Sequence, residues 1–507
     1  MLESKDKHRA RIAGTLAAIA LFIAGPSLAA TVNFSTYLGS TGPDWVRDVV
    51  YDAAGNLYAV GGSRSSNLPT TPGTAQPVFG GYEDAFVAKF SPKGKLLWAT
   101  YLGGVELDRA YAVELDGNGD VVIAGRAGAS FPVTAGAVQT QFKGGATSGT
   151  IYPHPQDGFV AKLRGSNGKK LWATFFGATD GHFAIVRDIA VDPVSGWIYL
   201  AASTDTGTYP SAVLSAFQRG NRKTRFGGTD GVLAQLSGDG RSLGWATYVG
   251  GSGEENPTPS VRLDAQGNPI ILFASTSSDA KTTRGAFNRF FGGVSDFYLA
   301  KFAINGPLLW ATFVGGSQAE RVETHNLAIR TDGSIVIAGA TTSTNFPTVA
   351  GAYDRSWNST NGAADCGIAV LSPAGSALLA GTYYGGKLGD NCEGVGSDSQ
   401  GNIYVSGGTA SLDLPLLGAI QTKLPSSPSP FVAVFGKDLA KLRFATYFGS
   451  SKPGIARDLI VRSEGKFTFG GEVEAPGYPL MLPVQTGVSP SVSHGVVTKL
   501  SVVLGPG

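Results

Sequence analysis

One short phrase occurs seven times in this chain, and it limits the possible folds more than any other feature. The copies are WATYLGG at 98, FSTYLGS at 34, WATFFGA at 172, WATYVGG at 245, WATFVGG at 310, AGTYYGG at 380 and FATYFGS at 444. Their threonines lie at 36, 100, 174, 247, 312, 382 and 446, so successive copies are 64 to 74 residues apart. A repeat of this length, with several strands in each copy, indicates propeller blades.

Four strand-like runs recur in a fixed order within each period. In the first full period they are VRDVVYDAAGN from 46, LYAVGG from 57, DAFVAKFS from 84 and the phrase itself. In the third run Phe86, Ala88 and Phe90 fall on one face, while Val87 and Lys89 fall on the other, as in a strand. The 72 glycines and the 42% hydrophobic content suit a β-protein with many tight turns. We therefore expect an all-β protein.

The first copy of the phrase precedes every other repeated run. The last period, in turn, stops after a third-type run, GVVTKLSVVLG from 495, and has no fourth run. Residues 31–40 supply a fourth strand without a blade. The sequence thus predicts a seven-bladed β-propeller of four-stranded antiparallel blades, closed by the N-terminal strand pairing into the C-terminal blade. Such closure removes open sheet edges.

The N-terminus is typical of an export signal. Basic residues precede an apolar run over 12–25, and Ser27-Leu28-Ala29 offers small residues for cleavage. We expect a signal peptide over 1–29, one propeller over 30–507, and a secreted, periplasmic or cell-surface protein. The predicted blades span approximately 41–104, 105–178, 179–251, 252–316, 317–386, 387–450 and 451–507, with 31–40 as the closing strand of the seventh.

The combination of TYLGG, D-x-x-G-N-x-Y, a proline-centred loop and D-x-F-V-A-K resembles the SBBP repeat family. Its members are seven-bladed β-propellers of secreted and surface-exposed bacterial and archaeal proteins. The resemblance covers 31–507. The chain departs from the family pattern in blade 4, where Pro269 replaces an apolar or aromatic residue. It also departs in blade 7, where SEGKFTFGG is one residue shorter than the corresponding run of the family. The resemblance implies a propeller fold and export, and it brings no agreed catalytic residues.

Charge and motifs exclude several function classes. Removing 1–29 takes away four basic and two acidic residues, which changes 40 basic and 38 acidic residues to 36 of each. A neutral mature chain argues against nucleic-acid binding. We expect no membrane span in the mature chain, no cofactor, no metal site and a monomer. The histidines beyond the signal lack metal-ligand spacing; they are His154, His182, His325 and His494. DGNGD at 116–120 has the alternating oxygens of a calcium loop, but we interpret it as a hairpin turn.

Two groups of basic residues are candidate ligand contacts. VRD or its relative ARD recurs in the first run of blades 1, 3 and 7 and contributes Arg47, Arg187 and Arg457. First strands line a propeller's channel, so these residues either form a charged wall or make structural pairs between neighbouring blades. The second group lies in the long loop of blade 3 with Phe217 and Phe226; its basic residues are Arg219, Arg222, Lys223 and Arg225. This loop either binds an acidic glycan or another anionic surface, or is a solvated charge run.

Cys366 and Cys392 are the two cysteines of the chain. Cys366 opens the third strand of blade 5, and we place Cys392 in the connection into blade 6. Both positions fall on one face of the ring, and export favours oxidation. We therefore predict a Cys366–Cys392 disulfide, with two buried thiols as the alternative.

The function that these observations favour is a non-enzymatic binding scaffold. It would present loops on one face of the propeller to a protein or polysaccharide partner. An exported propeller enzyme is the alternative, either a glycan lyase or hydrolase, or a quinoprotein-like dehydrogenase. GKLLW at 94–98 is similar to the turn-strand phrase of quinoprotein dehydrogenases, but no cofactor-binding set is recognisable.

Overall fold

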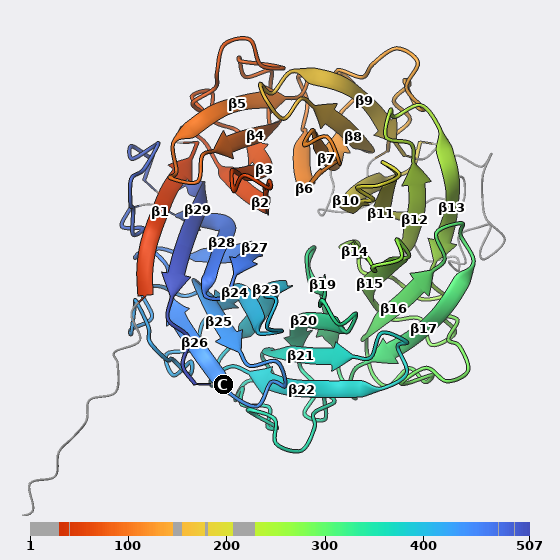
Figure 1. Cartoon of the computed structure of the whole chain (residues 1–507), viewed down its shortest axis with the longest axis vertical. Coiled ribbons are helices and arrows are strands. Elements are labelled where there is room, and N and C mark those ends of the chain that lie inside the picture. The colour runs from red at the N-terminus through yellow and green to blue at the C-terminus, as the bar shows by residue number, and fades with distance from the viewer. Residues whose placement is uncertain are drawn as a thin grey trace, which may run out of the picture.

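Seven antiparallel sheets surround a central axis (Figure 1). The computed structural model describes residues 30–39, 41–145, 155–177, 181–205, 229–474, 476–490 and 492–506. Every regular element in these ranges is a strand, and none of the described segments is a helix that could cross a membrane. The predicted all-β propeller with seven blades is confirmed.

Each of the first three blades runs outward from the axis in sequence order. Blade 1 contains β2 (Asp44–Tyr51), β3 (Leu57–Ser63), β4 (Asp84–Phe90) and β5 (Leu96–Leu102). Blade 2 contains β6 (Arg109–Leu115), β7 (Val121–Ala127), β8 (Asp157–Leu163) and β9 (Lys170–Phe176). Blade 3 contains β10 (Ala184–Val191), β11 (Ile198–Thr204), β12 (Asp230–Leu236) and β13 (Leu243–Val249).

The later blades repeat this order with changes in the innermost strand. Blade 4 contains β14 (Ser260–Leu263), β15 (Pro269–Ser275), β16 (Asp296–Phe302) and β17 (Leu308–Val314). Blade 5 has its innermost strand split into β18 (Glu320–Arg321) and β19 (Leu327–Ile329), which both pair with β20 (Ile335–Thr341), followed by β21 (Asp365–Leu371) and β22 (Leu378–Tyr384). Blade 6 contains β23 (Asp390–Ser397), β24 (Ile403–Thr409), β25 (Ser429–Phe435) and β26 (Leu442–Tyr447).

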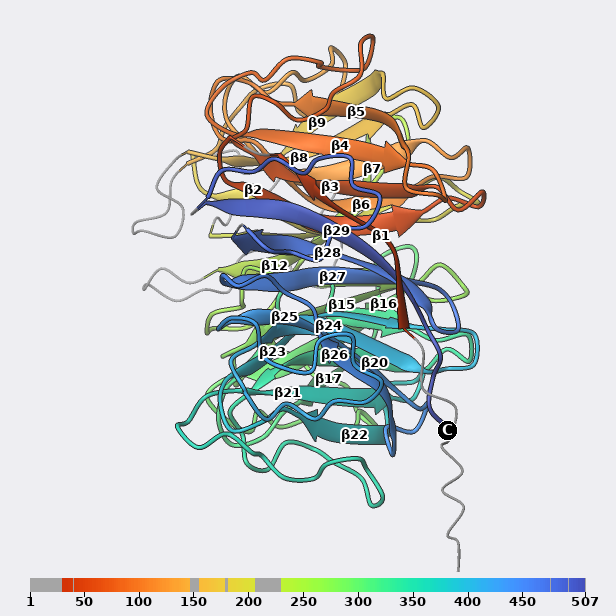
Figure 2. The same ribbon diagram turned by 90° about the vertical axis from the view of Figure 1, so that its left-hand side faces the viewer.

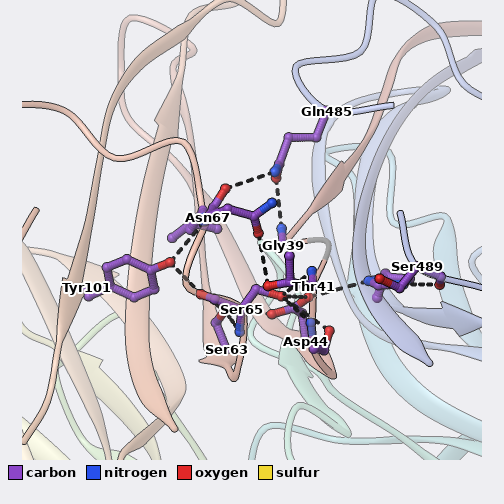
Figure 3. Close-up of polar contacts among 12 residues, drawn as sticks. Gly39, Thr41, Asp44, Ser63, Ser65, Asn67, Tyr101, Gln485 and Ser489 are labelled. Atoms are coloured by element: carbon purple, nitrogen blue, oxygen red, sulfur yellow. Dashed lines mark hydrogen bonds and ion pairs between the residues drawn. The ribbon is translucent and has the colours of Figure 1, made fainter. Parts of the chain in front are cut away.

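The N-terminal strand closes the ring. Blade 7 has the order β1 (Ala30–Leu38), β29 (Ser493–Val502), β28 (Lys466–Glu474) and β27 (Gly454–Ser463), so the predicted closure is confirmed. Figure 2 shows β1 beside β29. Phe34, Tyr37 and Leu38 are buried on closure. At the end of β1, the backbone N–H of Gly39 donates to Gln485 Oε1 (Figure 3).

The repeated phrase fastens each outermost strand to its surroundings. Its threonine hydroxyl accepts a backbone N–H from the long loop of the same blade, as Thr100 does from Gln76 (2.8 Å) and Thr382 from Asp354 (2.9 Å). Its tyrosine hydroxyl donates to a carbonyl of that loop, as Tyr383 does to Ser343 (2.7 Å). Its tryptophan N–H reaches a turn of the next blade, as Trp98 does at Gly165 O (3.1 Å). The threonine contact is made in blades 1, 2, 4, 5, 6 and 7, whereas two copies of the phrase have phenylalanine in place of tyrosine and three lack the tryptophan.

The two faces of the ring carry different connections. The long loops between the second and third strands of each blade, together with the blade-to-blade connections, lie on one face, which we call the upper face. Short turns lie on the lower face, where Asp116 Oδ1 accepts the N–H groups of Asn118 and Asp120 (both 2.9 Å). Asp116 also pairs with Lys162. The interpretation of DGNGD as a hairpin turn is confirmed.

Candidate functional site at the channel mouth

The innermost strands carry a β-bulge at one common level. Register shifts occur between Val46 and Asp48, Ala110 and Ala112, Val186 and Asp188, Cys392 and Gly394, and Ala456 and Asp458. A bulge leaves one residue outside the ladder and turns its side chain away from the regular alternation. The bulged residues are Arg47, Tyr111, Arg187, Glu393 and Arg457.

All five bulged side chains line one small cavity on the axis, together with Glu323, Thr324 and His325 of blade 5. We call these eight residues the channel mouth. The structure therefore brings together Arg47, Arg187 and Arg457, which the sequence analysis grouped as one recurring element of the first strands. Sequence reasoning missed Tyr111 and Glu393. Alignment of the five first runs would have found them, because they occupy the position that arginine holds in the other three blades.

The aspartate that follows each arginine has a different role. The backbone N–H of Val113 in blade 2 donates to Asp48 Oδ2 (2.6 Å), and that of Val261 in blade 4 donates to Asp188 Oδ2 (2.8 Å). The N–H of Val49 in blade 1 reaches Asp458 Oδ2 at 3.3 Å. Each aspartate thus binds its blade to the next one. The expected structural pairing between blades exists: the aspartates make it with backbone groups, Asp188 also pairs with Arg262 of blade 4, and Arg457 pairs with Glu393 of blade 6.

The arginines differ in how their charges are balanced. Arg457 forms ion pairs with Glu393 (2.7 Å) and Glu472 (2.6 Å). Arg109, above the mouth, pairs with Glu83 and stacks on the ring of Trp45 at 3.9 Å. Arg47 is only partly buried and forms no ion pair with any described residue, and its buried Nε has no hydrogen-bond partner. Burial, followed by the charge of Arg457, lowers the pKa of Arg47 to about 10.

Tyr111 lies among several guanidinium groups. The Cζ atoms of Arg187, Arg126 and Arg47 are 4.3, 5.7 and 5.9 Å from the centre of its ring. Burial raises the pKa of the Tyr111 hydroxyl, but the positive charges of Arg126, Arg187, Arg109 and Arg47 outweigh burial and lower this pKa to about 8. Positive charge at the mouth contributes to both shifts: for Arg47 it is the second cause after burial, and for Tyr111 it outweighs burial.

A polar cleft extends from the mouth over blades 5 and 6. Its volume is about 380 Å³, and it shares Glu323 and Glu393 with the mouth. Asn256, Arg321, Thr342 and Asn391 supply further donors and acceptors to the cleft. Burial raises the pKa of Glu393 to about 7, against the opposing effect of Arg457. The cleft and the mouth together could hold an elongated polar ligand with an anionic group at the axis.

The predicted disulfide forms one wall of this cleft. Cys366 in β21 and Cys392 in β23 are bonded, with their Cα atoms 5.2 Å apart. Cys392 lies inside the first strand of blade 6 rather than in the connection before it, because that strand already begins at Asp390. The bond joins blade 5 to blade 6 directly beside Glu393.

Below the mouth the channel is acidic. Asp48, His325 and Asp458 come from three blades, and they present possible ligand atoms within 4.8 Å of one another. However, His325 Nε2 lies 3.1 Å from the Tyr111 carbonyl oxygen, and both oxygens of Asp48 accept backbone N–H groups. Burial, followed by the charge of Asp458, raises the pKa of Asp48 well above its ordinary value. These contacts hold the blades together and leave few free lone pairs for a cation.

The second candidate group from the sequence, Arg219, Arg222, Lys223 and Arg225, lies outside the described residues.

No protein-family profile and no curated protein sequence matches this chain. Solved structures with a similar arrangement include the quinohemoprotein alcohol dehydrogenase from Comamonas testosteroni, with 10% identity, coverage of 94% of this chain and 77% of that chain, and a TM-score of 0.42. The RRP9 WD40 repeats match at 9% identity, with coverage of 94% and 100% and a TM-score of 0.44. Puromycin hydrolase matches at 12% identity, with coverage of 88% and 54% and a TM-score of 0.39.

Proposed function

We propose that this protein is an exported, non-enzymatic binding propeller that takes an anionic group of its ligand into the channel mouth. The observation that carries the proposal is Arg47, a half-buried arginine whose Nε has no hydrogen-bond partner and which has no ion-pair partner among the described residues. Guanidinium groups bind carboxylates and phosphates in bidentate fashion, and they do so more strongly where water is partly excluded. A ligand anion at Arg47 would remove the local excess of positive charge.

The ligand class that fits best is an acidic polysaccharide. The mouth would bind a carboxylate, while the amides of Asn256 and Asn391 and the hydroxyl of Thr342 would bind neutral hydroxyl groups along the cleft. The resemblance to secreted repeat proteins favours a location outside the cytoplasm. The Cys366–Cys392 disulfide supports the same location, because such bonds persist in oxidising compartments.

Calorimetric titration with oligogalacturonate and with neutral dextran tests the proposal. We expect oligogalacturonate to bind with an affinity that falls as salt is added, and dextran not to bind. Arg47→Gln should weaken binding about tenfold or more, because it removes a charge-assisted contact. The control is Arg241→Gln at an exposed lower-face turn, which should bind like the parent protein. Equal binding of both sugars, or an unchanged Arg47→Gln variant, would refute the proposal.

A glycan lyase is the second candidate, and Tyr111 is the observation that favours it. A phenol with a pKa near 8 could remove a proton beside a uronate carboxylate that arginine neutralises. Ultraviolet absorbance of the protein mixed with oligogalacturonate separates the two functions, because a lyase produces an unsaturated sugar that absorbs ultraviolet light. If the absorbance grows with the parent protein and does not grow with Tyr111→Phe, the protein is a lyase rather than a non-enzymatic binding protein.

A further inference from the structure

Pairs of acidic side chains recur at the upper face where one blade meets the next. One acid begins the third strand of a blade, and the other stands at or just before the first strand of the following blade. The pairs are Asp84 with Asp108, Asp230 with Glu255, Asp296 with Glu320, and Asp365 with Asp390. All of these side chains are fully buried. We call them the junction pairs.

A glycine of the repeated phrase lies between the members of each pair. A Cβ atom placed on Gly103, Gly250, Gly315 or Gly385 would lie no more than 3.0 Å from a carboxyl oxygen of both acids. The two acids therefore face each other across a glycine that carries no side chain to separate them.

Most oxygens of the pairs already accept a hydrogen bond. In the pair between blades 4 and 5, Gly292 N–H donates to Asp296 Oδ2 (2.7 Å), and the Thr341 hydroxyl donates to Glu320 Oε1 (2.7 Å). Gly316 N–H reaches Glu320 Oε2 at 3.3 Å. The remaining oxygen, Asp296 Oδ1, is buried without a donor. It is directed at the same glycine as Glu320 Oε2.

The same orphan oxygen recurs in other pairs. Asp84 Oδ1 and Asp365 Oδ1 are buried without a donor, and both are directed at their junction glycines. An unpaired buried oxygen on a charged group is costly, so its repetition at equivalent places needs a common explanation. Two ionised carboxylates cannot satisfy each other, because both only accept hydrogen bonds.

No basic side chain in the described part of the chain balances the charges of the Asp296–Glu320 pair. Among the described residues, neither Asp296 nor Glu320 forms an ion pair with Lys, Arg or His. The groups that face this pair are the N–H groups of Gly292 and Gly316, the hydroxyls of Thr341 and Ser343 and, further away, the Tyr383 hydroxyl. All but Tyr383 are hydrogen-bond donors to the pair, and all are uncharged at neutral pH.

The junction that closes the ring has a different composition. There His494 stands in place of the third-strand acid, and its Nδ1 lies 3.4 Å from Asp44 Oδ2. Ser63 and Ser65 donate to the two oxygens of Asp44 (Figure 3). At the junction of blades 6 and 7, Ser429 takes the acid's place beside Gly449. His494 can donate a hydrogen bond to Asp44, which an ionised aspartate cannot. The junction of blades 6 and 7 has no acid pair, because its first strand begins at Gly454 and the Ser429 hydroxyl donates to the Pro430 carbonyl (3.4 Å).

We propose that each junction pair shares one proton, so that the folded ring holds a set of proton-binding sites that join neighbouring blades. One acid of each pair is then neutral and donates to the other through the oxygen that otherwise has no donor. The proton supplies the hydrogen bond that His494 can supply to Asp44 at the junction that closes the ring.

The pKa values agree with this arrangement. Burial raises the pKa of Glu320 to about 7 and that of Asp365 to about 7. Burial also raises the pKa of Asp108 to about 8 and that of Asp84 to about 6. In the unfolded chain Asp and Glu titrate near pH 4. The folded state thus binds more protons than the unfolded state, and stability is lost as pH rises from about 4 to about 8.

The test compares Asp296→Asn with the parent protein in urea unfolding between pH 5 and pH 8. The asparagine amide can donate permanently where the shared proton does, and its oxygen can still accept from Gly292. We expect the number of protons released on unfolding to fall by about one, and the variant to melt at a higher temperature than the parent at pH 8. Glu320→Gln should behave in the same way from the other side of the pair.

The matched control is Asp438→Asn at an exposed lower-face turn, which should keep the pH dependence of the parent. Two results would overturn the proposal. One is that the Asp296→Asn and Glu320→Gln variants release as many protons on unfolding as the parent protein does. The other is a parent protein whose melting temperature falls on addition of a chelator, since a metal ion would then join the acids. Neither result concerns the channel mouth, so this test is independent of the proposed binding function.

Discussion

In the repeated phrase, the absence of a side chain at one glycine allows two acidic residues to approach each other. From the sequence, the glycines after each outer strand are interpreted as turn residues. In the structure, Gly315 does not have a positive φ, so backbone conformation does not require glycine there. Glycine is required because Asp296 and Glu320 approach its Cα from two blades. The residue type was predictable from the repeat, but its cause was not, because the second acid belongs to the next repeat.

Gly315→Ala tests this cause. The new methyl group would lie less than 3.0 Å from both carboxyl groups, so one acid must move and lose its hydrogen bonds. We expect a loss of about 1–3 kcal/mol in the free energy of unfolding, measured by urea denaturation. Gly487→Ala is the control, because nothing lies within 4 Å of its Cβ position and its φ is not positive. A Gly315→Ala protein as stable as the control would contradict the close approach.

The innermost strands combine regular pairing with one irregular residue each. The alternation of apolar and polar residues predicts such strands well, since burial on one face is a local property of the sequence. It does not predict a bulge, because the extra residue is defined only against the partner strand. The sequence therefore indicates Arg47 as a candidate for the channel wall or for a pair between blades, but it does not indicate that Arg47 meets Tyr111 and Glu393 at one level.

The disulfide links the third strand of blade 5 covalently to the first strand of blade 6. Cys366→Ala/Cys392→Ala should lower the free energy of unfolding by about 3–4 kcal/mol, which is the loop-closure estimate for the separation of 26 residues. We also expect faster proteolysis near Asn391, because blade 6 loses its tie to blade 5 beside the cleft. Urea denaturation with and without a reductant measures the first effect.

The control for this prediction lies in the response to the reductant. It should destabilise the parent protein and leave the double variant unchanged. If the reductant left the unfolding free energy of the parent protein unchanged, even when it was added to the unfolded protein in urea, the cysteines would not form the bond in solution.

At the scale of the whole molecule, the number of repeated phrases predicts the closed ring. Seven phrases, one of them without a blade, fix the number of sheets and the way they close, because each period is a complete local unit. What the count leaves open is which residues meet across the axis. His325 reaches the carbonyl of Tyr111 from 214 positions away, and no pattern within one period encodes that contact. Its position depends on the diameter of the closed ring and on the split inner strand of blade 5.

Closure also contributes to the stability of the ring. A chain that starts at Asp44 lacks β1, so Phe34, Tyr37 and Leu38 no longer fill the core, and β29 becomes an open edge. Each large side chain contributes about 1.5–3 kcal/mol when buried, so a loss of several kcal/mol is expected on thermal or urea unfolding. An unpaired edge strand also recruits other chains, so light scattering should detect association. A chain that starts at Ala30 keeps β1 and should stay monomeric with a higher melting temperature. If the two shortened chains melted alike and both remained monomers, the pairing of β1 with β29 would not be what closes the ring.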